Sequence, residues 1–263
     1  MSWRRIRGVI LQNFLVMRHS PIRIMEVLYW PLLEVVLWGF ITRYLLSIDA
    51  SIKGGVAVLL GAVVLWDLMF RSQQELSVTY LIDMWDRNVI NLHASPLRQS
   101  EYVAGGMIFS LGRVLVGTTV LVVVALLAFD FNLFNAGAVL LPSLLILMVM
   151  GWALGLFIRA MVMRFGSNAE VLVWSLAFGL QPVSAVFYPV ASLPSPLQAV
   201  AHGIPAAHVF EALRAFFSSG EVLGSRLWLA AGLDVLYLGV AALVAAKMYN
   251  NVRRLGILAR PGY

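Results

Sequence analysis

Six long apolar stretches decide what this chain can fold into. They are residues 27–46, 55–74, 102–129, 136–158, 171–190 and 227–246. Each holds about 20 or more mostly apolar residues, the length that a helix needs to cross the ~30 Å hydrocarbon core of a bilayer. The 263-residue chain is 61% hydrophobic and 12% charged, whereas soluble domains are near 45–50% and about 25%. We therefore predict an all-α integral membrane protein with six transmembrane helices, built as a single transmembrane domain over residues 1–263.

The positions of the basic residues predict how these helices are oriented. With six crossings and a cytoplasmic N-terminus, thirteen of the 19 lysines and arginines fall on the cytoplasmic side, as the positive-inside rule requires. They are Arg4, Arg5, Arg7, Arg18, Arg23, Arg87, Arg98, Arg159, Arg164, Lys247, Arg253, Arg254 and Arg260. The net charge of +6 therefore reflects membrane topology, and we expect no nucleic-acid partner. Both termini are predicted to be cytoplasmic.

A seventh apolar stretch, residues 196–217, does not fit this pattern. It carries His202, Pro205, His208, Glu211 and Arg214, and charged side chains are costly on a lipid-facing helix. A further crossing here would also move the last four cations to the outside. We therefore predict that residues 191–226 form an outer re-entrant segment between the fifth and sixth transmembrane helices.

Residues 1–21 form a unit of their own. The residues Arg4, Arg5, Gly8 and Gln12 make a polar stripe at helical spacing, and the residues Trp3, Ile6, Ile10, Phe14 and Met17 face elsewhere. This pattern is typical of an amphipathic helix in the cytoplasmic interface, with its cations near anionic headgroups. Pro21 is expected to end it. A frayed basic tail is the alternative.

Several kinds of chemistry are excluded by composition. A phosphate-binding loop needs Lys followed by Ser or Thr, but Lys53 precedes Gly and Lys247 precedes Met. There is no cysteine, so disulfides, iron–sulfur clusters and thiol catalysis are ruled out. The four histidines lack metal-ligand spacing. We expect no catalytic residue, metal site or cofactor in this chain, so any ATP hydrolysis would belong to a partner.

Five charged residues fall inside the predicted transmembrane helices, namely Glu34, Asp67, Arg71, Arg113 and Asp234. Each costs about 2.5–3.5 kcal/mol near the bilayer centre if unpaired. The spacing of Asp67, Arg71 and Glu75 allows pairing along one helix face. Glu34 and Arg113 have no such partner on their own helices, which favours them as pathway residues. A polar pathway and structural ion pairs both explain the set.

Small residues recur at four-residue spacing in two of the predicted helices. Gly151 and Gly155 form a G-x-x-x-G pattern, and Ala241 and Ala245 repeat the spacing in the last helix. Such pairs let helix backbones approach closely. The pattern fits packing within the chain or a seam between two copies.

The longest predicted cytoplasmic loop, residues 75–100, has its own periodicity. Leu81, Trp85, Val89 and Leu92 fall on one stripe of a helix, and the polar residues Asp83, Asp86, Arg87 and Asn91 face away. Pro96 is expected to stop this helix. Such a helix could lie on the membrane or dock into a groove on a cytoplasmic partner.

Two parts of the sequence resemble a known family. The run from Asn91 to Gly105, NLHASPLRQSEYVAG, is similar to the loop that enters the third transmembrane helix of ABC-2 type transporter permeases. The run Phe187 to Pro194, FYPVASLP, resembles the extracellular stretch after the fifth helix of that family, and the residues that extend this match are Pro205, His208, Glu211 and Arg214. The order and topological positions of the motifs fit over essentially the whole chain.

The resemblance implies a half-transporter of the bacterial inner membrane that lacks its own ATPase. Two copies, by default a homodimer, would form the pathway, and separate nucleotide-binding subunits that hold ATP and Mg would grip the loop. The implied partner-binding residues on the coupling helix are Leu81, Asp83, Trp85, Asp86, Arg87, Val89, Leu92, His93 and Pro96. The implied pathway or gate residues are Glu34, Asp67, Arg71, Arg113, Tyr188, Glu211 and Arg214. Export of an amphipathic or bulky substrate, such as a lipid, lipid-linked glycan or drug, is expected.

Two other classes of protein remain as alternatives. An ion-coupled secondary carrier would favour inverted repeats with helices broken by Gly or Pro in both halves, and no clear repeat emerges here. A membrane-embedded lipid-modifying enzyme would need carboxylates or histidines at one depth, and the chain offers scattered single ones.

Overall fold

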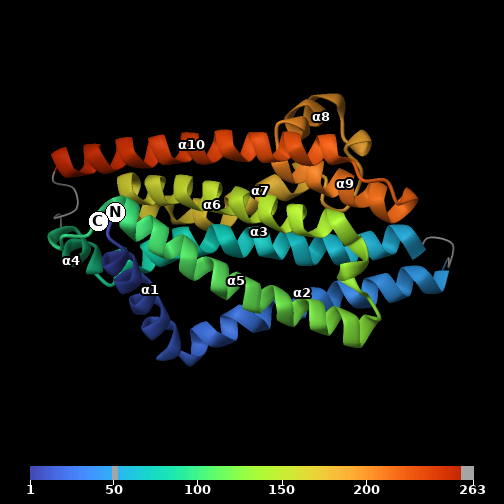
Figure 1. The fold of residues 1–263 in the computed structure, drawn as a ribbon, viewed down its shortest axis with the longest axis horizontal. Coiled ribbons are helices and arrows are strands. Elements are labelled where there is room, and N and C mark those ends of the chain that lie inside the picture. Colours follow the sequence, from blue (N-terminus) through green and yellow to red (C-terminus); the bar gives the residue numbers. More distant parts are fainter. Residues whose placement is uncertain (49–52, 256–263) are drawn as a thin grey trace.

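The protein is described by a computed structural model that covers residues 1–48 and 53–255. All regular elements in these residues are helical, and no strand occurs among them (Figure 1). The α-helices are α1 Trp3–Arg18, α2 Pro21–Ile48, α3 Lys53–Trp85, α4 Asn88–Ala94, α5 Gln99–Phe129, α6 Leu140–Phe165, α7 Glu170–Val183, α8 Ser195–His202, α9 Pro205–Ser219 and α10 Gly224–Arg254. Short 3-10 turns, η2 Leu133–Val139, η3 Gly166–Ala169 and η4 Val190–Ser192, join some of them.

Four helical stretches of the described residues are long and apolar enough to cross a membrane. They are Arg23–Ile48, Gln99–Phe129, Leu133–Val183 and Gly224–Arg254. The third has 51 residues, and it contains two α-helices, α6 and α7, that are separated by η3. The expectation of an all-α, multi-pass membrane protein is therefore confirmed.

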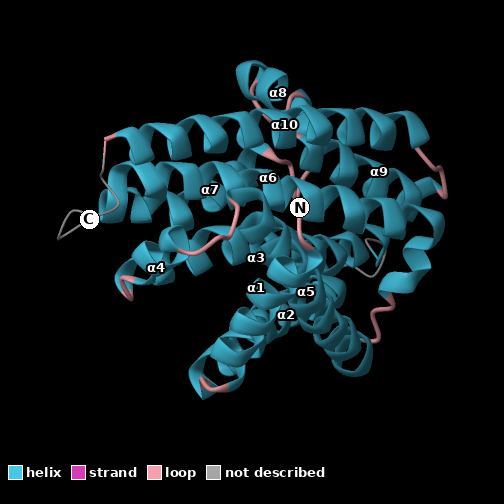
Figure 2. Cartoon of the chain, turned by 60° about the vertical axis from the view of Figure 1, so that its left-hand side comes forward, coloured by secondary structure: helices cyan, strands magenta, loops and turns pink. Residues whose placement is uncertain are grey.

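The long helices form a bundle with α3 and α6 at its centre. Helix α6 lies along both α3 and α10, and α3 also packs on α5, α2 and α9. Figure 2 shows α1, α2 and α5 on one side of this centre and α10 and α8 on the other. Helices α2, α3, α5, α6, α7 and α10 alternate in direction (Figure 1). One end of the bundle holds α4 together with the C-terminal ends of α3, α6 and α10, and we call it the basic end because Arg98, Arg164, Arg253 and Arg254 lie there.

Close packing of α6 against α3 explains the glycine pattern. A Cβ atom on Gly151 would collide with the carbonyl oxygen of Met69, and one on Gly155 would lie 2.5 Å from that of Gln73. Backbone cannot yield as a flexible side chain can, so these positions need glycine. Ala241 and Ala245 are likewise buried against α6. Of the two interpretations of these small residues, packing within the chain is confirmed.

The N-terminal segment is helical, as its periodicity predicts. Helix α1 buries Ile6 and Val9 against α5, where the missing side chain of Gly105 leaves room for Val9. The alternative of a frayed tail is wrong. Helix α2 begins at Pro21 itself, because Pro is well tolerated in the first turn of a helix.

Candidate functional site

The segment from the end of α3 through α4 is the candidate partner-binding site. The predicted single helix through Leu81 and Leu92 is wrong, because α3 ends at Trp85 and α4 begins at Asn88. Between them Arg87 adopts a left-handed conformation with φ 55°, which ends the helix and redirects the chain. The stripe expected on one helix is therefore divided between two.

The break changes which side chains of this segment are accessible. Among the predicted partner-binding residues, those exposed are Trp85, Asp86, Arg87 and Pro96, those buried are Leu81, Asp83 and Val89, and Leu92 is half-buried. The side chain of His93 lies outside the described part of the structure. Trp85 is 51% exposed and Ile90, which the periodicity did not select, is 50% exposed. Trp85 and Ile90 are thus the large apolar side chains that this segment leaves exposed.

The turn between α3 and α4 is anchored to the bundle by one buried carboxylate. Asp83 accepts a short hydrogen bond from the hydroxyl of Tyr102 on α5 and another from Asn88 Nδ2 at 2.9 Å. A charged acceptor with two donors is stronger than a neutral hydrogen bond. Sequence spacing could not find this contact, because Asp83 and Tyr102 lie on different helices. Asp83 of α3 therefore connects Asn88 of α4 to Tyr102 of α5.

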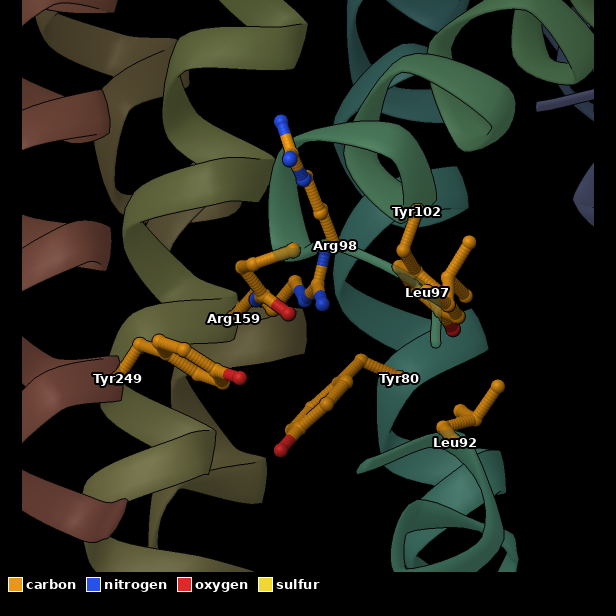
Figure 3. A pocket seen from close by; sticks show the side chains of 8 residues that line it. Tyr80, Leu92, Leu97, Arg98, Tyr102, Arg159 and Tyr249 are labelled. Carbon is orange, nitrogen blue, oxygen red and sulfur yellow. The ribbon is translucent and has the colours of Figure 1, made fainter. Parts of the chain in front are cut away.

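Arg159 of α6 continues this network toward the core. Its guanidinium lies 4.7 Å from the ring centroid of Tyr80 and 4.4 Å from that of Tyr102 (Figure 3). Arg159 was predicted only as one of the cytoplasmic cations, and the structure buries it almost completely. Cation–π contacts between an arginine and two aromatic faces stabilise a charge that burial removes from water. The two tyrosines thus link α3, α5 and α6.

The charges inside the bundle form defined ion pairs. Arg71 Nε lies 2.7 Å from Asp67 Oδ2, as the spacing predicts. Glu75 does not continue that row but binds Arg113 Nη1 of α5 at 2.6 Å, so Arg113 does have a carboxylate partner. Glu34 on α2 is half-buried. The pair of Glu75 with Arg113 thus joins α3 to α5 near their centre.

Asp234 of α10 is different from these pairs. It is buried, and neither carboxylate oxygen has a hydrogen-bond partner among the described residues. A buried carboxyl group without a donor is unfavourable when it is ionised. The last helix therefore carries an isolated acidic group inside the bundle.

The hairpin of α8 and α9 contains the predicted pair of Glu211 and Arg214, with 3.1 Å between Oε1 and Nη2. The pair also ties down the chain after α7. Arg214 Nη2 donates to the carbonyl of Ala185 at 2.7 Å, and Glu211 accepts from the backbone of Val190 at 2.9 Å. The hydroxyl of Tyr188 donates to the carbonyl of Pro182 at 2.6 Å. The ion pair therefore fixes the irregular stretch between α7 and η4.

The family model described as ABC-2 type transporter matches residues 12–217, which is well over half of the chain. The chain belongs to the ABC-2 type transporter family. The match covers the ion pairs of α3, the α3–α4 segment and the α8–α9 hairpin. No curated protein matches this chain.

Membership places this ABC-2 permease among the membrane components of transporters. Such components work in general with an ABC ATPase and are not themselves catalytic.

Proposed function

We propose that this ABC-2 permease is the transmembrane subunit of an ATP-driven exporter, with two copies forming the pathway and a separate nucleotide-binding subunit supplying energy. The observation that carries the proposal is the family match over residues 12–217 in a chain whose two lysines cannot form a phosphate-binding loop. ATP and Mg²⁺ would be held by the partner. This chain contributes its helices and its exposed α3–α4 turn.

The proposed topology has six crossings by α2, α3, α5, α6, α7 and α10, with the basic end in the cytoplasm. Support comes from their alternating direction (Figure 1) and from the arginines of the basic end. A stretch of 51 residues would be about 76 Å long as one helix, more than twice the hydrocarbon thickness, so α6 and α7 are separate crossings. Residues 1–21 would lie in the cytoplasmic interface, residues 75–100 would couple to the ATPase, and residues 191–226 would re-enter the outer leaflet.

Coupling would pass from the partner through the α3–α4 turn. Closure of the ATPase dimer would push on exposed Trp85 and Ile90 and tilt α4. Because Asp83 is bonded to Tyr102, and because Arg159 stacks on Tyr102, the push would reach α5 and α6 together. The contact of Tyr102 with Arg159 would then couple the movements of α5 and α6.

The proposed pathway lies along the ion pairs of α3 and α5, beside Glu34 of α2. The pairs Asp67–Arg71 and Glu75–Arg113 would present polar groups to the headgroup of an amphipathic cargo, while apolar walls accept its tail. At the outer end, Tyr188 and the Glu211–Arg214 pair would act as the gate. A lipid, a lipid-linked glycan or an amphipathic drug fits this division of polar and apolar surface.

Asp234 favours one alternative, an ion-coupled secondary carrier. A buried carboxyl group without a hydrogen-bond donor among the described residues is the kind of group that takes up and releases a proton during transport. Such a carrier would work without an ATPase, so the two functions differ in a partner that can be isolated.

The decisive experiment is affinity purification of the permease from its native membrane in mild detergent, followed by mass spectrometry and an ATPase assay. A stoichiometric companion with a phosphate-binding loop is expected. Trp85→Asp should reduce its recovery at least tenfold, whereas Leu255→Asp, which alters another exposed apolar residue of the basic end, should not. Isolation of the permease alone, without ATPase activity, would favour the carrier instead.

A further inference from the structure

A small cavity at the basic end adjoins the contact of Arg159 with Tyr102. It lies where α3, α5, α6 and α10 meet and is lined by Tyr80, Arg98, Gln99, Tyr102, Arg159 and Tyr249 (Figure 3). Leu92 of α4 and Leu97 complete its wall. The cavity is narrow and partly open to the surroundings. Five helices or their ends therefore converge on one polar space.

Arg159 gives this cavity hydrogen-bond donors that nothing in the described structure accepts. Arg159 is 2% exposed, and its Nε and Nη1 atoms have no hydrogen-bond partner among the described residues. The rings of Tyr80 and Tyr102 stabilise the guanidinium through its faces, whereas hydrogen bonds are made in its plane. The in-plane donors are thus available to a ligand.

The other polar groups around the cavity are also mainly donors or cations. The Nε2 amide of Gln99 is buried and has no partner among the described residues. Exposed Arg98 lines the cavity, and the guanidinium of Arg253 lies 5.9 Å from the ring centroid of Tyr249. The acidic groups beside this cluster are Asp83, which is bonded to Tyr102 and Asn88, and Glu101, which is bonded to Arg5 and to the backbone of Arg98. Both are buried, and the guanidinium groups of Arg5, Arg98, Arg159 and Arg253 outnumber them.

We propose that this cavity binds a phosphate group, with Arg159 and Gln99 as the buried donors and Arg98 at the mouth. An oxyanion offers several acceptors to the planar fork of an arginine, and Arg–phosphate pairs are among the stronger hydrogen-bonded contacts in proteins. The phosphate can belong to the headgroup of an anionic lipid or be free inorganic phosphate. The site lies at the helix ends, where headgroups lie in a bilayer.

A bound phosphate would act on the segment that connects α3 to α5. Leu92 and Leu97 line the same cavity as Arg159, so a ligand that fills it holds α4 against the bundle. The inference does not depend on ATP-driven transport, because binding can be measured on the permease alone.

The test uses the full chain purified in neutral detergent. Native mass spectrometry measures binding of dioctanoyl phosphatidylglycerol, with dioctanoylglycerol as the phosphate-free control. The unfolding midpoint measures binding of inorganic phosphate at constant ionic strength. We expect phosphate-dependent binding in one or both arms. Binding only of the phospholipid identifies a headgroup site, and a similar midpoint rise with inorganic phosphate identifies a site for the free anion.

Variants distinguish binding inside this cavity from nonspecific attraction of an anion to the basic end. Gln99→Leu and Arg98→Gln should each weaken binding at least fivefold, and Arg159→Lys, which keeps the charge but loses the fork, at least tenfold. Arg254→Gln removes an exposed cation of the same end that does not line the cavity, so it should leave affinity within twofold. If Arg159→Lys fails to fold, Gln99→Leu still tests whether a buried donor of the cavity contributes to binding. Equal losses in Arg254→Gln and Arg98→Gln, or no binding in either arm, would overturn the proposal.

Discussion

Helices α2 and α6 are both apolar along most of their length, but they differ in how much of their surface the rest of the chain buries. In the most apolar part of the stretch that contains α6, 61% of residues are buried within the chain, against 20% for α2. Helix α6 meets α3 through glycines and α10 through alanines, whereas α2 exposes large side chains such as Trp30, Leu37 and Phe40. Apolar composition therefore indicates a membrane helix without saying what covers it. Small residues at regular spacing indicate the helix that packs against its own chain.

The largest effect is expected where α6 touches α3. Gly155→Leu places a side chain against the backbone of Gln73, which cannot yield, and should destabilise the protein by about 3 kcal/mol. Gly112→Leu is the matched control, because a Cβ atom there has nothing within 4 Å. The unfolding midpoint in detergent and the monodisperse fraction after size exclusion measure the difference. Equal behaviour of the two variants would contradict the central role of α6.

A smaller effect is expected from the ion pair between α3 and α5. Glu75→Leu leaves Arg113 without its carboxylate at 2.6 Å and should cost about 2 kcal/mol, because one charge then stays in the bundle uncompensated. The double variant Glu75→Leu/Arg113→Leu should recover most of that loss. If the two single losses simply add, the pair does not hold α3 to α5.

Asp83, which anchors the α3–α4 turn, should contribute less to the free energy of unfolding than the Glu75–Arg113 pair. Asp83→Ala removes the acceptor of both Tyr102 and Asn88 and should lower the free energy of unfolding by about 1.5 kcal/mol. Asp86→Ala, three residues further on and exposed, should change it by less than about 0.5 kcal/mol. A double-mutant cycle of Asp83→Ala with Tyr102→Phe isolates the coupling. A coupling near zero would mean that this hydrogen bond does not hold the end of α3 to α5.

The smallest effect is expected on the outward face of α2. Leu37 is 60% exposed, so Leu37→Ala should change the stability of a single chain by less than about 0.5 kcal/mol. The unfolding midpoint measured over a range of protein concentrations sharpens the comparison with α6. A loss that appears only at high concentration would show that a second copy covers α2.

Sequence reasoning succeeds where an interaction is local in the chain. The pairs Asp67–Arg71 and Glu211–Arg214 follow from spacings of four and three residues, and the apolar stretches predict where long helices occur. Sequence reasoning fails where a local conformation or contact depends on how the helices pack against one another. Nothing local favours a left-handed Arg87, so the break between α3 and α4 was not predicted.

Contacts between helices set the rest of the candidate site. Glu75 has a possible partner four residues away in Arg71, yet it binds Arg113, 38 residues away, because the register of α3 against α5 brings them together. The position of Arg159 between Tyr80 and Tyr102 likewise depends on three helices at once. Periodicity describes one helix at a time and cannot supply such a register.

The shortness of α7 has a consequence for the surrounding lipid. Its 14 residues extend about 21 Å, which is about 9 Å less than the hydrocarbon thickness that the proposed topology has it cross. Backbone without regular structure follows at once, and non-helical backbone at that depth is tolerated only where protein covers it or water reaches it. Arg214 and Glu211 supply part of that cover by bonding Ala185 and Val190. In the proposed topology the remaining mismatch would thin the bilayer beside α7, so the membrane there would be thinner than around the longer helices.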